Sequence, residues 1–251
     1  MDDETKQFYT ELFKDLPRCG PGSAEATRKA YSYLKDIPEN PRILDIGVGT
    51  GMSTIELAKI SQGDIMAIDV IEEYLEVLNS KLSEEQLKGN LKTHIMSMDA
   101  IEFEENSFDI IWSEGSIFVI GFQTGLKTWR KFLKKGGYLV VSDMVWYDDI
   151  GPMEVINYWE RNYPAMENQK ELPPIIQKLG YKLIGSFKLK EKKDWWQNLY
   201  EPLAVQVKKL QKKYKDNPLF AEQLKETELE MEYFRKYSNF YGYMFFVMKK
   251  I

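Results

Sequence analysis

The stretch Ile43–Gly51 runs Ile-Leu-Asp-Ile-Gly-Val-Gly-Thr-Gly, a short apolar segment followed by glycines at alternate positions. Glycine lets a backbone turn sharply and approach a bound molecule where a Cβ would clash. A helix is predicted to follow, and the start of a helix offers free N–H groups to such a molecule. Gly47, Gly49 and Gly51 therefore predict a loop that holds a nucleotide-like ligand.

The spacing of these glycines and the acid before them narrow the choice of ligand. Dinucleotide sites usually follow G-x-G-x-x-G and seat a pyrophosphate on the helix N-terminus. Here the third glycine comes one residue earlier, and Asp45 precedes the loop. A carboxylate there would repel a pyrophosphate but can orient an ammonium, directly or through water. S-adenosylmethionine (SAM) has that ammonium and no phosphate. We therefore favour SAM over NAD, although the glycines alone leave both open.

Two further acids follow at the ends of the next predicted strands. Asp69 lies about 20 residues beyond the loop, where related folds place an acid on the ribose hydroxyls. Asp99, in Ser97-Met98-Asp99-Ala100, can accept a hydrogen bond from an adenine amine while Met98 packs on the ring. A solvated Asp69 and an Asx turn at Asp99 are the alternatives. Open α/β sheets bind ligands at these carboxyl ends of strands.

A fourth signal comes just after the next buried strand. Glu114 faces the crevice where the transferred group should point, and can bind a cationic substrate or act as a base. The alternative is a capping or salt-bridging Glu. The neighbouring Ser113 is predicted to contact the cofactor.

The elements around these residues alternate between strand and helix, which predicts a parallel sheet covered on both faces. The C-terminal part differs, because a charged, helix-rich segment separates the last two strands. We expect one domain over residues 1–251, with a helical lid at 1–40, a cofactor-binding core at 41–150 and a helical cap insertion at 190–240. The predicted strands are Arg42–Ile46, Asp64–Val70, Leu91–Met96, Phe108–Trp112, Tyr138–Ser142, Tyr181–Leu189 and Tyr243–Met248. The predicted helices include Glu4–Lys14, Ser53–Ser61, Glu72–Leu82, Gly121–Lys135, Met153–Asn162 and Lys170–Leu179.

With these signals in order, the chain resembles class I SAM-dependent methyltransferases. It is most similar to the uncharacterised small-molecule branch beside the ubiquinone/menaquinone C-methylases, the type 11 methyltransferases. The resemblance implies a Rossmann-like α/β sheet of seven strands, the last one antiparallel, and S-adenosylhomocysteine as the product. It assigns SAM contacts to Asp45, the three glycines, Asp69, Met98 and Asp99. The stretches that carry it are Leu16–Ser23, Leu44–Gly51, Ser97–Asp99, Trp112–Gly115, Ile120–Phe122, Trp129–Tyr138 and Tyr241–Phe246.

The chain departs from that family pattern at two positions. Val48 replaces the usual Cys or Ala, which matters little because the backbone binds the cofactor. Val119 stands where relatives often carry Asn, which puts a polar substrate contact there in doubt.

Substrate contacts are predicted from two features. Arg18, in a Pro/Gly-rich segment, can pair with a substrate carboxylate or phosphate, and a plain surface Arg is the alternative. Tyr147, Trp195, Trp196 and Tyr200 offer aromatic faces to a sulfonium or a cationic substrate. Most aromatic side chains are core residues, so we favour the last three, which open the cap.

Composition also limits the partners, metal sites and cellular location that we expect. The net charge of −5 argues against nucleic acid as a partner. Cys19 is the single cysteine, and no His/Cys cluster predicts a metal site. Neither a secretory signal nor a span of about 20 apolar residues is visible, so we expect a cytoplasmic protein without membrane contact. A homodimer is possible.

Methyl transfer from SAM to a small molecule is the function that these features favour. The alternatives are a SAM-binding sensor or partner-binding protein without catalysis and, less favoured, an NAD-dependent oxidoreductase.

Overall fold

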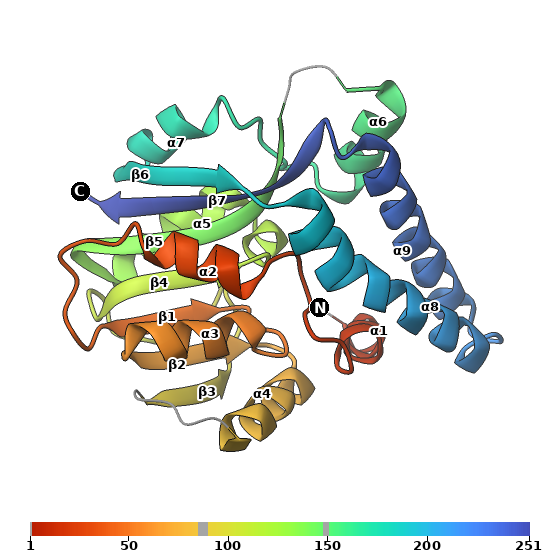
Figure 1. Ribbon diagram of the computed structural model, residues 1–251, viewed down its shortest axis with the longest axis horizontal. Coiled ribbons are helices and arrows are strands. Elements are labelled where there is room, and N and C mark those ends of the chain that lie inside the picture. Colours follow the sequence, from red (N-terminus) through yellow and green to blue (C-terminus); the bar gives the residue numbers. More distant parts are fainter. Residues whose placement is uncertain (1, 85–89, 148–150) are drawn as a thin grey trace.

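The computed structural model describes residues 2–84, 90–147 and 151–251. Its centre is a seven-stranded sheet in the order β3-β2-β1-β4-β5-β7-β6 (Figure 1). β7 runs antiparallel to both of its neighbours, while β1 to β5 pair in parallel. This confirms the predicted fold class. The strands are β1 Arg42–Ile46, β2 Asp64–Asp69, β3 Leu91–Ile95, β4 Phe108–Glu114, β5 Leu133–Trp146, β6 Tyr181–Lys188 and β7 Tyr241–Lys250.

Helices cover both faces of the sheet. In Figure 1, α2 (Ala24–Tyr31) and α3 (Met52–Ser61) lie in front of it and α5 (Phe122–Trp129) lies behind. Successive side chains of a strand point to opposite faces. Accordingly, Ile43 and Leu44 of β1 belong to two separate buried clusters. The carboxyl ends of the central strands thus meet at one edge between two helical layers.

Several predicted element ends differ from the structure, most of all between α5 and β5. The helix expected over Gly121–Lys135 ends at Trp129, a 3-10 turn covers Arg130–Phe132, and β5 already starts at Leu133. The register of β5 on β4 shifts between Phe108 and Ile110, so an irregularity opens there. Gly136, with φ of +75°, lies in this irregularity rather than at a helix end. Glycine inside a strand commonly marks such a bulge.

The helix-rich segment between β6 and β7 is present as predicted. It begins with η3 (Glu191–Tyr200), a π-helix, and continues with α8 (Glu201–Lys213) and α9 (Pro218–Tyr237). Figure 1 shows α8 and α9 reaching beyond the sheet, with α1 (Asp3–Phe13) against α8. Gln206 Nε2 of α8 donates to the Glu11 carbonyl of α1 at 2.8 Å. The remaining helices are α4 Glu72–Glu84, α6 Met153–Asn162 and α7 Leu172–Lys178.

The cap also holds the segment between α1 and α2. The Gly22 N–H donates to the Asp194 carbonyl at 2.7 Å, and Asn198 Nδ2 donates to the Gly22 carbonyl at 2.8 Å. Both partners belong to η3. The inserted segment therefore fixes the N-terminal segment by binding both the N–H and the carbonyl of Gly22. The division into lid, core and cap stays a prediction, and residues 148–150 at the end of the predicted core lie outside the described part. No helix among the described residues is long and apolar enough to cross a membrane.

Candidate active site

The loop from β1 to α3 requires its glycines. Gly47, Gly49 and Gly51 have φ of +71°, +53° and +84°, a region that side chains disfavour. A Cβ on Gly49 would lie 2.9 Å from Cys19 Sγ, and one on Gly47 would lie 2.4 Å from Ser116 Oγ. Side chains of the protein therefore fill the space where a Cβ would stand, and the glycine backbone itself lines the cavity described below.

Asp45 lies beneath this loop and is 1% exposed. Its Oδ2 has no hydrogen-bond partner in the described protein. Burial raises the pKa of this carboxyl to about 7; the nearby Thr54 hydroxyl opposes the rise, and the negative charge of Glu114 adds to it. A buried carboxylate oxygen without a donor is costly unless a ligand supplies one. An ammonium or an ordered water would satisfy it.

The two acids at the next strand ends approach the same loop. Asp69 Oδ2 accepts from the Gly49 N–H at 2.9 Å and Oδ1 from the Ile71 N–H at 3.0 Å. Burial raises the Asp69 pKa, and these N–H donors lower it. Asp99 is exposed and accepts from Ser97 Oγ at 2.5 Å. The Met98 carbonyl accepts from Trp129 Nε1 at 2.8 Å, which fixes this loop on α5.

A cavity of about 1110 Å³ runs along these strand ends. The three glycines, Asp69, Met98, Asp99, Glu114 and Arg18 all line it, as predicted for a common site. Beyond them the wall consists of residues from the loop after β4, the end of α6 and one face of α1. These are Phe118, Val119, Ile120, Asn162, Tyr163, Lys6, Tyr9 and Phe13.

Glu114 lines the cavity with a nearly buried carboxylate. Its Oε1 accepts from Thr27 Oγ1 at 2.7 Å and Trp112 Nε1 at 3.0 Å, and its Oε2 accepts from Arg18 Nη2 at 3.2 Å. Burial raises the Glu114 pKa, while Arg18, Thr27 and Trp112 lower it. Both oxygens are thus occupied by donors of the protein itself. This arrangement holds the N-terminal segment against the end of β4.

Ser113 does not line the cavity. It points to the opposite face of β4 from Glu114, and its Oγ lies 2.7 Å from Ser116 Oγ. Ser116 in turn donates to the Ile46 carbonyl at 2.9 Å and does line the cavity. No sequence signal marks Ser116 as a site residue, because only the register of β4 beside β1 brings it to the glycine loop.

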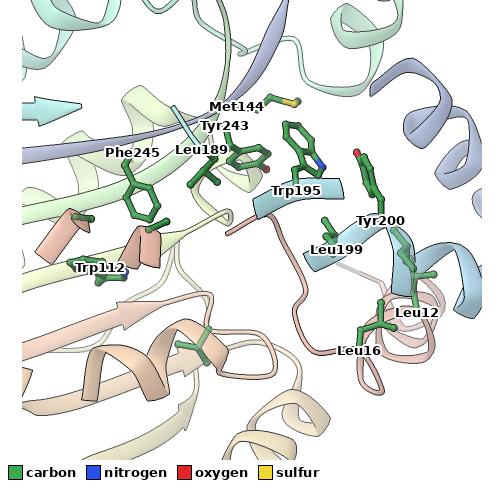
Figure 2. Close-up of a cluster of buried hydrophobic side chains, with 14 of the residues drawn as sticks. Leu12, Leu16, Trp112, Met144, Leu189, Trp195, Leu199, Tyr200, Tyr243 and Phe245 are labelled. Atoms are coloured by element: carbon green, nitrogen blue, oxygen red, sulfur yellow. The ribbon is translucent and has the colours of Figure 1, made fainter. Parts of the chain in front are cut away.

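The four predicted aromatic substrate contacts also lie outside the cavity wall. Figure 2 shows Trp195 between Tyr243 and Tyr200, with ring centroids at 5.0 Å and 5.7 Å. Tyr200 donates to Glu230 Oε1 at 2.6 Å. Trp196 lies under the Arg235 guanidinium and Tyr147 under the Lys188 ammonium. These rings pack the cap onto the sheet, because amphipathic cap helices must bury their apolar faces.

Comparison with known proteins agrees with this geometry. A family model described as a methyltransferase domain matches residues 37–217. The chain belongs to this family. It is 27% identical over 210 residues to a phosphoethanolamine N-methyltransferase of Plasmodium falciparum, covering 79% of this chain and 73% of that protein. It is 32% identical over 119 residues to the ubiquinone/menaquinone C-methyltransferase UbiE of Geotalea daltonii, covering 46% and 50%.

Solved structures share the fold across the whole chain. A SAM-dependent methyltransferase from Geobacter sulfurreducens, in complex with S-adenosyl-L-homocysteine, superposes with a TM-score of 0.79 at 17% identity. The match covers 98% of each chain. The chain is therefore a SAM-dependent methyltransferase with the class I fold. The residues fit that cofactor, since the three glycines, Asp69 and Asp99 line one cavity. Asp45, predicted to contact the cofactor, lies buried beneath the glycine loop and is not part of the cavity wall.

Proposed function

We propose that this methyltransferase binds SAM along the Gly47–Gly51 loop and methylates a small molecule held in the rest of the cavity. The observation that carries the proposal is that cofactor loop, strand-end acids and a second wall share one cavity of about 1110 Å³. Pockets for a single small ligand occupy about 300–1000 Å³. The space therefore accommodates an acceptor beside the cofactor, which favours catalysis over a sensor without an acceptor site.

SAM supplies a methyl group on a sulfonium, which is already electrophilic, so the protein contributes mainly alignment and exclusion of water. Asp45 lies beneath the loop and outside the cavity wall, so it would orient the ammonium of the methionine moiety through an ordered water on its Oδ2. Asp69 already accepts two backbone N–H groups, and each carboxylate oxygen has a second lone pair for a ribose hydroxyl. Asp99 would accept from the adenine amine beside Met98.

Glu114 is proposed to orient the acceptor molecule rather than to deprotonate it. Burial raises its pKa, but three donors of the protein already bind its two oxygens and hold the carboxylate in place. Its partner Arg18 lines the same cavity, and the guanidinium has further N–H groups beyond its bonds to Glu114 and the Gly20 carbonyl. Arg18 can therefore donate to a carboxylate or phosphate in the cavity.

Calorimetry with SAM and S-adenosylhomocysteine tests the cofactor assignment. We expect both to bind in the micromolar range, and Asp45→Asn to weaken them while the protein stays folded. A metabolite extract with methyl-labelled SAM then tests for an acceptor, detected as labelled product by mass spectrometry. Absence of binding at millimolar SAM would refute the proposal, and NADH is the control ligand for the oxidoreductase alternative. A homodimer stays a prediction, which light scattering checks.

A further inference from the structure

A second polar pair, Tyr163 and Asp143, stands where the end of α6 meets the cavity. Tyr163 follows α6 and lines the cavity with its ring 6.0 Å from that of Phe118, edge to face. Its hydroxyl donates to Asp143 Oδ2 at 2.7 Å. Asp143 belongs to β5 and is 2% exposed, so this carboxylate lies behind the tyrosine.

The position of this pair relative to the cofactor loop follows from two contacts. Ser116 touches the glycine loop, since its Oγ donates to the Ile46 carbonyl. Phe118, two residues further, touches Tyr163. The short segment after β4 therefore connects the cofactor cradle to Tyr163 within a single cavity. Tyr163 lies on the side where a second molecule would meet the cofactor.

The direction of the hydrogen bond decides what Tyr163 can do. Because its proton points to Asp143, the lone pairs of its oxygen stay available as acceptors. Tyr163 is 5% exposed and forms part of the cavity wall. The other oxygen of Asp143, Oδ1, accepts from the Met144 N–H at 2.8 Å, which fixes the carboxylate. The pair is therefore arranged to accept a hydrogen bond from a protic group.

We propose that Tyr163 is a catalytic residue that binds the protic acceptor atom, a hydroxyl or amine, and passes its proton to Asp143. This proposal rests on the proposed function. The acceptor lone pair forms the new bond to the methyl carbon, and the electrons of the breaking C–S bond stay on sulfur. The acceptor proton moves to Tyr163 Oη as the tyrosine proton moves to Asp143 Oδ2. No other reactant is needed.

The surroundings of Asp143 suit this role. Burial raises its pKa to about 7, with Glu167 adding to the rise and the Tyr163 hydroxyl and Met144 N–H opposing it. Tyr243 of β7 is the other titratable group that faces it, and its own pKa is raised by burial and then by Asp143. A carboxylate that titrates near neutral pH accepts and releases a proton readily. Asp143 acts through Tyr163 and is a positioning residue.

The exposed apolar side chains nearby indicate the rest of the acceptor. Phe118 is 42% exposed and Val119 is 63% exposed, although both line the cavity. The acceptor class is therefore a small molecule that carries a hydroxyl or amine beside an apolar or aromatic surface.

The first test needs no acceptor. In protein labelled with ¹³C-aspartate, with Asp143→Asn for assignment, the Asp143 carboxyl resonance is followed against pH. We expect titration near pH 7, and a higher midpoint in Tyr163→Phe because the lowering hydrogen bond is gone. If the Asp143 titration midpoint is the same in Tyr163→Phe as in the wild type, the proposed coupling of Tyr163 to Asp143 is wrong. Calorimetry with SAM on the same samples reports separately on the proposed function.

The second test measures turnover with an acceptor from the labelled extract. Tyr163→Phe should lower kcat by about 100-fold or more, the range of general acid–base catalysis, with KM for SAM nearly unchanged. Asp143→Asn should remove the decline of kcat below about pH 7. Tyr181→Phe is the matched control, since its buried hydroxyl donates to the Leu126 carbonyl outside the cavity. Equal kcat in Tyr163→Phe and Tyr181→Phe, or a methylated carbon as product, would overturn the proposal. A wild type that binds SAM but transfers no methyl group would refute the proposed function instead.

Discussion

The guanidinium of Arg18 donates to Glu114 Oε2 at 3.2 Å, although the two residues stand 96 positions apart in the chain. Their side chains are 10% and 2% exposed. This pair joins the segment after α1 to the end of β4, beside the cofactor loop. It therefore fixes one wall of the cavity, because it ties the segment between α1 and α2 to a strand of the sheet.

Breaking this pair should be costly because the remaining charge stays buried. Glu114→Ala leaves Arg18 uncompensated, and such changes destabilise proteins by about 3–5 kcal/mol. Urea unfolding of the apo protein measures this. The control is Glu56→Ala, which breaks a pair with Arg28; the Arg28 side chain is 55% exposed and the Glu56 side chain 13%. The loss should be smaller, because the Arg28 charge is left in solvent rather than buried. Similar losses in the two variants would show that the Arg18–Glu114 pair is not a buried anchor.

Gly49→Ala should weaken SAM binding by about 10-fold or more. The residue has φ of +53°, where a side chain costs about 1–2 kcal/mol, and the new Cβ would lie 2.9 Å from Cys19 Sγ. The double variant Cys19→Ala/Gly49→Ala removes the Sγ contact but keeps the residue 19 Cβ at 3.0 Å and the backbone strain, so calorimetry should show only partial recovery. In Gly151→Ala, where the nearest atom is 3.5 Å away, affinity should not change. Unchanged affinity in Gly49→Ala would contradict a tight backbone cradle.

The cofactor half of the site was predictable because its signals are local in sequence. Asp45, Asp69 and Asp99 each follow or close a strand whose apolar pattern is visible. Parallel strands place their carboxyl ends at one edge, so strand order brings the later two acids together without further information. The alternation of strands and helices predicted the parallel sheet for the same reason.

The acceptor half was not predictable, because it depends on tertiary geometry. Tyr163 meets Asp143 only through the path of α6, and no sequence motif marks either residue. Trp195 and Tyr200 open the cap rather than lie in a strand, and only the tertiary structure shows that both rings pack on Phe234. Their aromatic rings therefore suggested a binding surface where the structure has core.

Asp45→Asn should stabilise the unliganded protein at pH 8 while weakening SAM binding. The folded-state pKa of about 7 lies above the ordinary 3.8, so the folded protein holds this proton more tightly than the unfolded chain. Stability from Asp45 is then complete below about pH 4 and is lost as pH rises through about 7. Removing that loss should raise Tm at pH 8 by about 2–4 °C for each kcal/mol recovered.

Thermal unfolding at pH 5 and pH 8, with and without SAM, measures both effects of Asp45→Asn. SAM should raise the Tm of the wild type most above pH 7, where Asp45 is ionised. Asp99→Asn, at an exposed carboxyl, should leave the apo Tm nearly unchanged. A lower Tm for Asp45→Asn at pH 8 would mean that the charged carboxylate has a partner in the apo protein.

Tyr200→Phe separates a core role from a substrate role in the cap. The Tyr200 hydroxyl donates to Glu230 Oε1 at 2.6 Å, and burial raises the Glu230 pKa. Losing this donor leaves a buried carboxyl less satisfied, which costs about 1–3 kcal/mol of unfolding free energy. Because Tyr200 lies outside the cavity wall, kcat and the KM for the acceptor should stay at wild-type values. If the KM for the acceptor rises while urea unfolding is unchanged, Tyr200 contacts the acceptor, as its place at the start of the cap predicts.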